Sequence, residues 1–220
     1  MKRTELSGAK GPRTRISSSL DRRGGSHPAQ DRMLIIAPPD AISYFETLIV
    51  DCDLPGHITL VAAHPASPDA FMALASQHHD RSGPFRRLFA ILDLPMGNMA
   101  SRHFYTEIRQ RVRHHDIVGN VLFRVLFSRP DFSLWRFLHT PMPPFPSDPA
   151  DYDPWLQQLA RQSQPHPLPE RAVALHTAME QARFLARERS LRPEDDAMPF
   201  TEVHEMISYL LRMQQRLHYR

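Results

Sequence analysis

Residues 33–40 read MLIIAPPD and residues 57–65 read HITLVAAHP, and these two apolar runs decide the predicted fold near the N-terminus. The first run ends at two prolines, and Asp40 stands where an N-cap would begin a helix over Ala41–Cys52. The second run is rich in β-branched residues, which is typical of a strand. Strand, helix and strand within about 30 residues predict a small βαβ unit, although runs this short also occur as buried coil or helix.

The apolar spacing after His64 predicts helices. Ser67-Pro68-Asp69 begins one that runs to about Asp80, with proline at its first position. Gly83-Pro84 begins a second, whose stripe is Phe85, Leu88, Phe89 and Leu92. A third begins at Asn98, because apolar positions then recur at intervals of three and four as on one helix face. That face is Tyr105, Ile108, Val112, His115, Gly119, Leu122 and Leu126.

Proline dominates the next segment, with six prolines from Pro141 to Pro154. Because proline interrupts helices and central strands, we expect an extended connector over residues 140–154. Beyond it the pattern predicts helices over Leu168–Leu191 and Thr201–His218, the second with a narrow apolar stripe. The predicted fold class is therefore mainly α, a helical domain with a small two-strand, βαβ-like element near the N-terminus.

Positive charge is concentrated in residues 1–32, which carry eight basic and three acidic side chains, a net charge of +5. This Ser- and Gly-rich segment has few large apolar residues, so we expect a disordered tail. A mainly helical body over 33–139, the Pro-rich connector over 140–154, and C-terminal helices over 155–220 that pack on the body or on a partner complete the predicted organisation.

The basic tail is a candidate nucleic-acid-binding arm, because Lys and Arg displace counterions from phosphates. An inert extension, or a stretch upstream of a start at Met33, is the alternative. The candidate contacts are Lys2, Arg3, Arg13, Arg15, Arg22 and Arg23 in the tail and Arg102, Arg109 and Arg113 on the helix after Asn98. For that helix, a solvated surface is the alternative.

A protein partner is also expected, because the terminal helix carries a Met-bearing stripe and the connector carries aromatic residues. Burial in the chain's own core is the alternative use of these side chains. The candidate interface residues are Phe145, Trp155, Met206, Leu210, Met213 and Leu217.

The stretch HDIVG, which begins at His115-Asp116, resembles the His-Asp motif of the HD phosphohydrolases, an all-helical, metal-dependent family. The resemblance implies a metal held by His115 and Asp116, an upstream helical histidine (His78 or His79) and a downstream aspartate (Asp148 or Asp151). The alternative follows from the helical spacing, which predicts His115 to be a buried, neutral, hydrogen-bonded imidazole without a metal.

No cofactor is predicted, because the sequence contains no G-x-G-x-x-G, no P-loop and no G-x-S-x-G. No apolar run approaches the roughly 18 residues of a membrane-spanning helix, so no membrane contact is expected. The single cysteine, Cys52, makes a reducing cytoplasm the expected setting. We therefore expect a non-enzymatic binding or regulatory protein, a candidate subunit of a nucleic-acid-associated complex. The alternative is an HD-like metal-dependent phosphohydrolase with His79, His115 and Asp116 as ligands.

Overall fold

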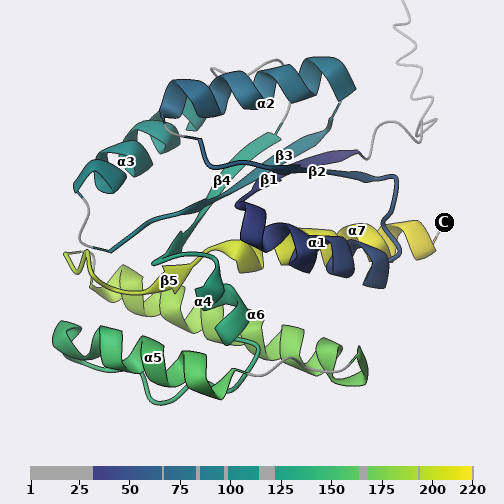
Figure 1. The fold of residues 1–220 in the computed structure, drawn as a ribbon. Coiled ribbons are helices and arrows are strands. Elements are labelled where there is room, and N and C mark those ends of the chain that lie inside the picture. Colours follow the sequence, from purple (N-terminus) through teal and green to yellow (C-terminus); the bar gives the residue numbers. More distant parts are fainter. Residues whose placement is uncertain are drawn as a thin grey trace, which may run out of the picture.

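The structure is a computed structural model, and it describes residues 32–65, 67–82, 85–96, 99–113, 122–163, 168–192 and 194–219. A five-stranded sheet in the order β2-β1-β3-β4-β5 lies at its centre (Figure 1). The first four strands along the chain are parallel, and the short last strand pairs antiparallel with β4. The strands are β1 (Met33–Ala37), β2 (Ile58–Ala62), β3 (Arg87–Asp93), β4 (Leu122–Arg129) and β5 (Phe200–Thr201).

Helices cover both faces of the sheet. In Figure 1, α2 and α3 lie on one face, α1 and α7 lie on the other, and α5 and α6 form a further layer beyond α4. The helices are α1 (Pro39–Asp51), α2 (Pro68–Ser82), α3 (Met99–Arg113), α4 (Ser133–Phe137), α5 (Tyr152–Gln162), α6 (Leu168–Leu191) and α7 (Val203–His218), with a 3-10 turn, η2, at Pro149–Asp151.

The strand β1 shows why the sheet needs both layers, since all five of its residues are buried. Met33, Ile35 and Ala37 belong to the core shared with α1 and α7, whereas Leu34 and Ile36 belong to the core shared with α2 and α3. Parallel sheets covered on both faces carry such near-continuous apolar runs. The predicted strand–helix–strand at the N-terminus is therefore confirmed as β1, α1 and β2, within a larger sheet.

The prediction of a mainly α fold with a two-strand element is wrong, because β3 and β4 extend the sheet. The run RLFAILD was expected to be helical on the spacing of Leu88, Phe89 and Leu92. In the structure Leu88 and Leu92 face the α2–α3 core and Phe89 faces the opposite core. A strand buried on both faces is apolar at nearly every position, so its apolar residues also match the spacing of a helix face.

The prediction that one helix continues from Asn98 to Leu126 is also wrong over its last part. The helix α3 ends at Arg113, and Leu122 and Leu126 belong to β4. Residues 114–121, which contain His115 and Asp116, lie outside the described residues, as does residue 98. Of the tail predicted over residues 1–32, residues 1–31 lie outside them as well.

The C-terminal helices match their predicted ranges closely, since α6 spans Leu168–Leu191 and α7 spans Val203–His218. In α7, Met206, Leu210 and Met213 are buried in the same core as β1 and α1. The candidate interface stripe is thus occupied within this chain, and Leu217 packs against its end.

The Pro-rich segment packs against α5 and α6. Trp155 is buried and its Nε1 donates to the carbonyl of Pro143 at 3.2 Å. Phe145 stacks on Tyr152 at 5.5 Å between ring centroids and meets Trp155 edge-on at 5.2 Å. These candidate interface aromatics therefore join the segment to α5. Among the described helices, none is both long and apolar enough to cross a membrane.

Candidate metal centre

The sheet has a topological switch point between β1 and β3. From β1 the chain passes through α1 to β2 on one side, then returns through α2 on the other face to β3. In open α/β sheets of this kind, ligands bind outside the carboxyl ends of the strands at the point where the chain diverges. The fold itself therefore selects the segments after Ala37 and around Asp93 as the place for a site.

Three side chains that can ligate a metal converge at this edge. Asp40 lies in the first turn of α1, His64 follows β2, and Asp93 is the last residue of β3. One ligand atom from each residue lies within 4.8 Å of the corresponding atoms of the other two. Atoms bound to one ion at about 2.1 Å lie about 3.4 Å apart in a tetrahedral site, so side-chain movements of about 1 Å would complete the triad.

Asp40 lies within the first turn of α1 and not at the predicted N-cap position. The helix α1 begins at Pro39, its N-cap residue is Pro38, and that cap makes no side-chain hydrogen bond. Asp40 was expected to be the N-cap, but it lies inside the first turn with an exposed side chain.

The carboxyl group of Asp93 is strongly perturbed. Its pKa is raised from 3.8 to about 6, mainly by burial and also by the nearby carboxylates of Asp131 and Asp40. A backbone hydrogen bond from Phe132 and the charge of His64 act in the opposite direction. Its Oδ1 is buried and has no hydrogen-bond partner among the described residues. A cation at this position would compensate both the burial and the like charges.

Two carboxylates and one imidazole form a ligand set with a chemical preference. Imidazole suits Zn²⁺, Fe²⁺ and similar ions, whereas carboxylates suit Mg²⁺ and Mn²⁺. A mixed set of three ligands is typical of divalent transition metals held with open coordination positions. Asp40 and His64 are exposed, so such positions would face solvent.

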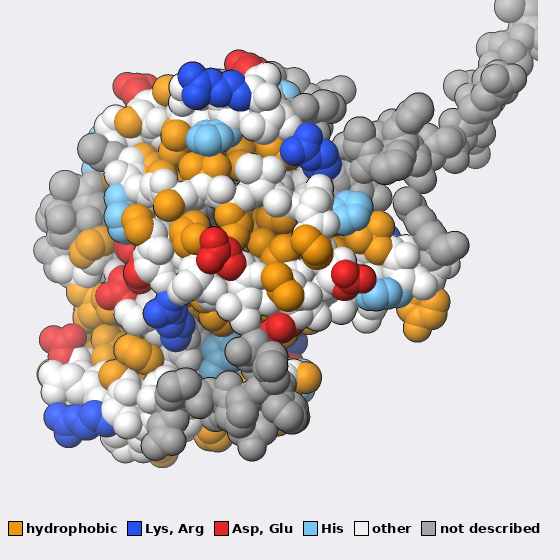
Figure 2. All heavy atoms as spheres, turned by 45° about the vertical axis from the view of Figure 1, so that its right-hand side comes forward, with side chains coloured by type: hydrophobic (Ala, Val, Ile, Leu, Met, Phe, Trp, Pro, Cys, Tyr) orange, Lys and Arg blue, Asp and Glu red, His pale blue; other side chains and the backbone are white. Residues whose placement is uncertain are grey.

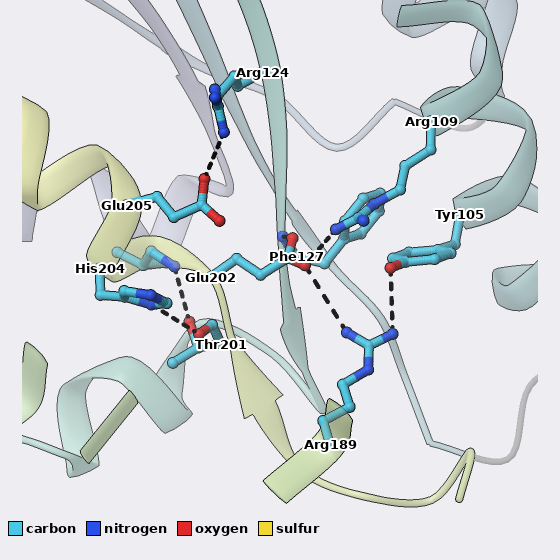
Figure 3. A network of polar contacts seen from close by, with 10 residues as sticks. Tyr105, Arg109, Arg124, Phe127, Arg189, Thr201, Glu202, His204 and Glu205 are labelled. Atoms are coloured by element: carbon cyan, nitrogen blue, oxygen red, sulfur yellow. Dashed lines mark hydrogen bonds and ion pairs between the residues drawn. The ribbon is translucent and has the colours of Figure 1, made fainter. Parts of the chain in front are cut away.

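The predicted nucleic-acid contacts are only partly described. The side chain of Arg109 lies in a polar network between α3, β4 and the start of α7 (Figure 3). It donates to Glu202, whose Oε2 also accepts the backbone N–H of Phe127 at 3.1 Å and whose Oε1 lies 3.9 Å from Arg189. Glu202 is 14% exposed. Arg109 is thus engaged within the fold, and the side chains of Arg102 and Arg113 lie outside the described ones.

The surface view supports no concentrated basic patch on the face it shows. In Figure 2 the arginine side chains of the described residues stand apart from one another on the face shown. The candidate contacts Lys2, Arg3, Arg13, Arg15, Arg22 and Arg23 all lie outside the described residues.

The ligands implied by the HD resemblance are not brought together among the described residues. His79 lies near the end of α2, with its ring 6.2 Å from that of Phe85, just before β3 begins. It is therefore at the amino end of the parallel strands, opposite to the triad. The described fold is α/β, whereas the resemblance implied an all-helical one.

Sequence reasoning did not identify Asp40, His64 or Asp93 as a site. A usable signal was present, since each polar residue follows or ends an apolar run: APPD, AAHP and AILD. Reading it required β3 to be recognised as a strand, because only parallel strands bring their carboxyl ends to one edge. Comparison of the chain with protein-family models, with curated proteins and with solved structures found no match.

Proposed function

We propose that this protein binds a divalent transition metal between Asp40, His64 and Asp93 and uses it to hydrolyse a phosphate ester. The observation that supports the metal site is the convergence of these three ligands, from three separate segments, at the topological switch point. An acidic cluster alone would be weak support. Three further observations support the site: the imidazole of His64, the buried Oδ1 of Asp93 without a hydrogen-bond partner among the described residues, and the position of the triad at the switch point.

The proposed chemistry follows from what such a cation does. Three protein ligands leave coordination positions for a water molecule and a substrate oxygen, and the metal lowers the pKa of that water. Cations held by carboxylates commonly take phosphate oxygens as their remaining ligands. The basic tail, with its net charge of +5 over residues 1–32, favours a polyanionic substrate such as a nucleic acid.

The alternative proposal is the one drawn from the sequence, a non-enzymatic binding or regulatory protein of the cytoplasm with a protein or nucleic-acid partner. Its support is the same basic tail, and in that case a cation at the triad would serve structure rather than chemistry. Both proposals allow a nucleic-acid partner, and they differ in whether the protein breaks a bond in it.

The experiment is a titration of chelator-treated full-length protein with Mn²⁺, followed by calorimetry, and a parallel assay of bis(p-nitrophenyl) phosphate hydrolysis. We expect binding and metal-dependent hydrolysis in the wild type, with both lost in Asp93→Asn and in His64→Gln. Asp80→Asn is the matched control, since Asp80 is an exposed aspartate at the end of α2. Its binding and activity should equal those of the wild type.

Each outcome separates the proposals. Binding without hydrolysis of this probe or of single-stranded DNA or RNA would favour the non-enzymatic protein. Absence of Mn²⁺ and Zn²⁺ binding would refute the metal site. Loss of metal in His115→Gln, with retention in His64→Gln, would favour the HD-like alternative.

A further inference from the structure

The segment from Asp131 to His139, which follows β4, lies directly against the proposed metal site. At its start, Asp131 accepts hydrogen bonds from the backbone N–H of Ser133 at 2.8 Å and from the Ser133 hydroxyl. Phe132 is fully buried, and its backbone forms the hydrogen bond to Asp93. The first residues of this segment are therefore anchored at one ligand of the triad.

The same segment holds the turn that carries a second ligand. The guanidinium of Arg136, on α4, donates through Nη2 to the backbone carbonyl of Asp40. Its Cζ lies 5.6 Å from the centre of the Phe132 ring, so the side chain is supported by a buried aromatic. One turn further along α1, the hydroxyl of Tyr44 shares a hydrogen bond of 3.2 Å with Nε2 of His139.

The first turn of α1 needs support of this kind. Its N-cap is Pro38, which makes no side-chain capping bond, and Pro39 follows. A side-chain cap fixes a helix start by accepting its free N–H groups, and none does so here; Arg136 instead holds this turn through the carbonyl of Asp40. A carboxylate on such a turn is poorly placed for metal binding unless another contact fixes the backbone.

We propose that Arg136 is a positioning residue of the metal site, which fixes the first turn of α1 so that the Asp40 carboxylate faces His64 and Asp93. This inference rests on the proposed function, because it assigns a role in cation binding at the same site. Arg136 does not touch the cation. It acts through the Asp40 backbone, as the supporting residues around metal ligands do.

The sign of the effect distinguishes positioning from plain electrostatics. Arg136 is a cation, and removal of a nearby positive charge should strengthen the binding of another cation. Removal of a positioning contact should weaken it, by roughly 10–100-fold for residues that support metal ligands. The two roles thus predict opposite changes.

The test measures Mn²⁺ affinity of the chelator-treated full chain by electron paramagnetic resonance, for the wild type, Arg136→Met and Arg136→Lys. We expect Arg136→Met to bind roughly 10–100-fold more weakly. Arg136→Lys keeps a donor and the charge, so it should recover most of the affinity. Arg124→Met is the matched control, because Arg124 is a surface arginine paired with Glu205 near the start of β4. Its affinity should be that of the wild type.

Affinity in Arg136→Met that is unchanged or tighter, with wild-type binding intact, would overturn this inference and leave the proposed function standing. Absence of binding in the wild type would instead overturn the proposed function. Thermal melts without metal show whether each variant folds. If Arg136→Met does not, Arg136→Leu, which also removes both the charge and the donor, takes its place. Weaker binding in Arg136→Leu supports the inference, and wild-type or tighter binding overturns it.

Discussion

Asp93 and His64 have ligand atoms within 4.8 Å of each other, although they come from β3 and β2, which are separated in the sheet by β1. The segments after β1 and β2 and the end of β3 meet at the carboxyl end of β1. The sequence separates the two residues by 29 positions and one whole helix, so the pairing is a property of the parallel sheet.

The first prediction concerns the competition between protons and metal at Asp93. Its pKa is raised to about 6, so protons compete with a cation below that pH. Mn²⁺ should therefore raise the midpoint of thermal unfolding at pH 7.5, by linkage between binding and folding, and raise it much less at pH 5. In Asp93→Asn the metal should raise it at neither pH. A shift at pH 5 as large as at pH 7.5 would contradict the assignment of Asp93 as a ligand.

The second prediction concerns stability without metal. The carboxyl group of Asp93 binds its proton more tightly in the folded chain, where the pKa is about 6, than at the ordinary value of 3.8. Protonation therefore favours folding, and the contribution of Asp93 to stability is lost as pH rises from about 4 to about 6. Because the side chain is partly exposed, Asp93→Asn should raise the free energy of unfolding in EDTA at pH 7.5 by only about 1–2 kcal/mol. Urea denaturation measures it, with the exposed Asp153→Asn as control, and a loss of stability in Asp93→Asn would contradict the prediction.

The third prediction concerns the network around Glu202. Glu202→Ala would leave Arg109 and Arg189 facing each other without their shared carboxylate and would free the N–H of Phe127. Because both arginines are about one-third exposed, we expect a loss of about 2–4 kcal/mol, somewhat below that for a fully buried pair. Glu205→Ala, which breaks the exposed pair with Arg124, should cost less than about 1 kcal/mol. Urea denaturation measures both losses of unfolding free energy. Equal losses would show that the network around Glu202 stabilises the fold no more than the exposed pair does.

The fourth prediction concerns the terminal helix. Leu210 is fully buried in the core between α7 and the sheet. Leu210→Ala should lower the free energy of unfolding by about 2–5 kcal/mol, through lost transfer energy and an imperfectly closed cavity. Leu191→Ala is the control, because Leu191 is 67% exposed. An unchanged denaturant midpoint in Leu210→Ala would mean that α7 does not pack on the sheet in solution.

The fifth prediction concerns the basic tail. Removal of residues 1–31 should weaken binding to single-stranded DNA or RNA and flatten its dependence on salt, because fewer counterions are released. The cut spares Arg32, whose Nη1 donates to the carbonyl of Ser82 at 2.7 Å. Fluorescence anisotropy at several salt concentrations measures both effects. Equal affinity of the truncated and full-length chains would assign the binding to the body of the protein.

Local signals in the sequence were sufficient for the elements that they describe. The prolines and β-branched run near the N-terminus predicted β1, α1 and β2, and the amphipathic spacing after residue 168 predicted α6 and α7. These elements have patterns with one clear period or clear ends, which local sterics and one buried face impose.

Only the tertiary structure decided that residues 87–93 and 122–129 are strands, because β3 and the last five residues of β4 are buried on both faces and so lose the alternation that marks a strand. That assignment in turn decided the candidate site. Asp40, His64 and Asp93 carry no motif, and they converge because parallel strands in this order end at one edge. The sequence by itself determined which side chains are available for chemistry, and the packing of the sheet determined which of them meet, since their proximity arises from strand order and not from spacing along the chain.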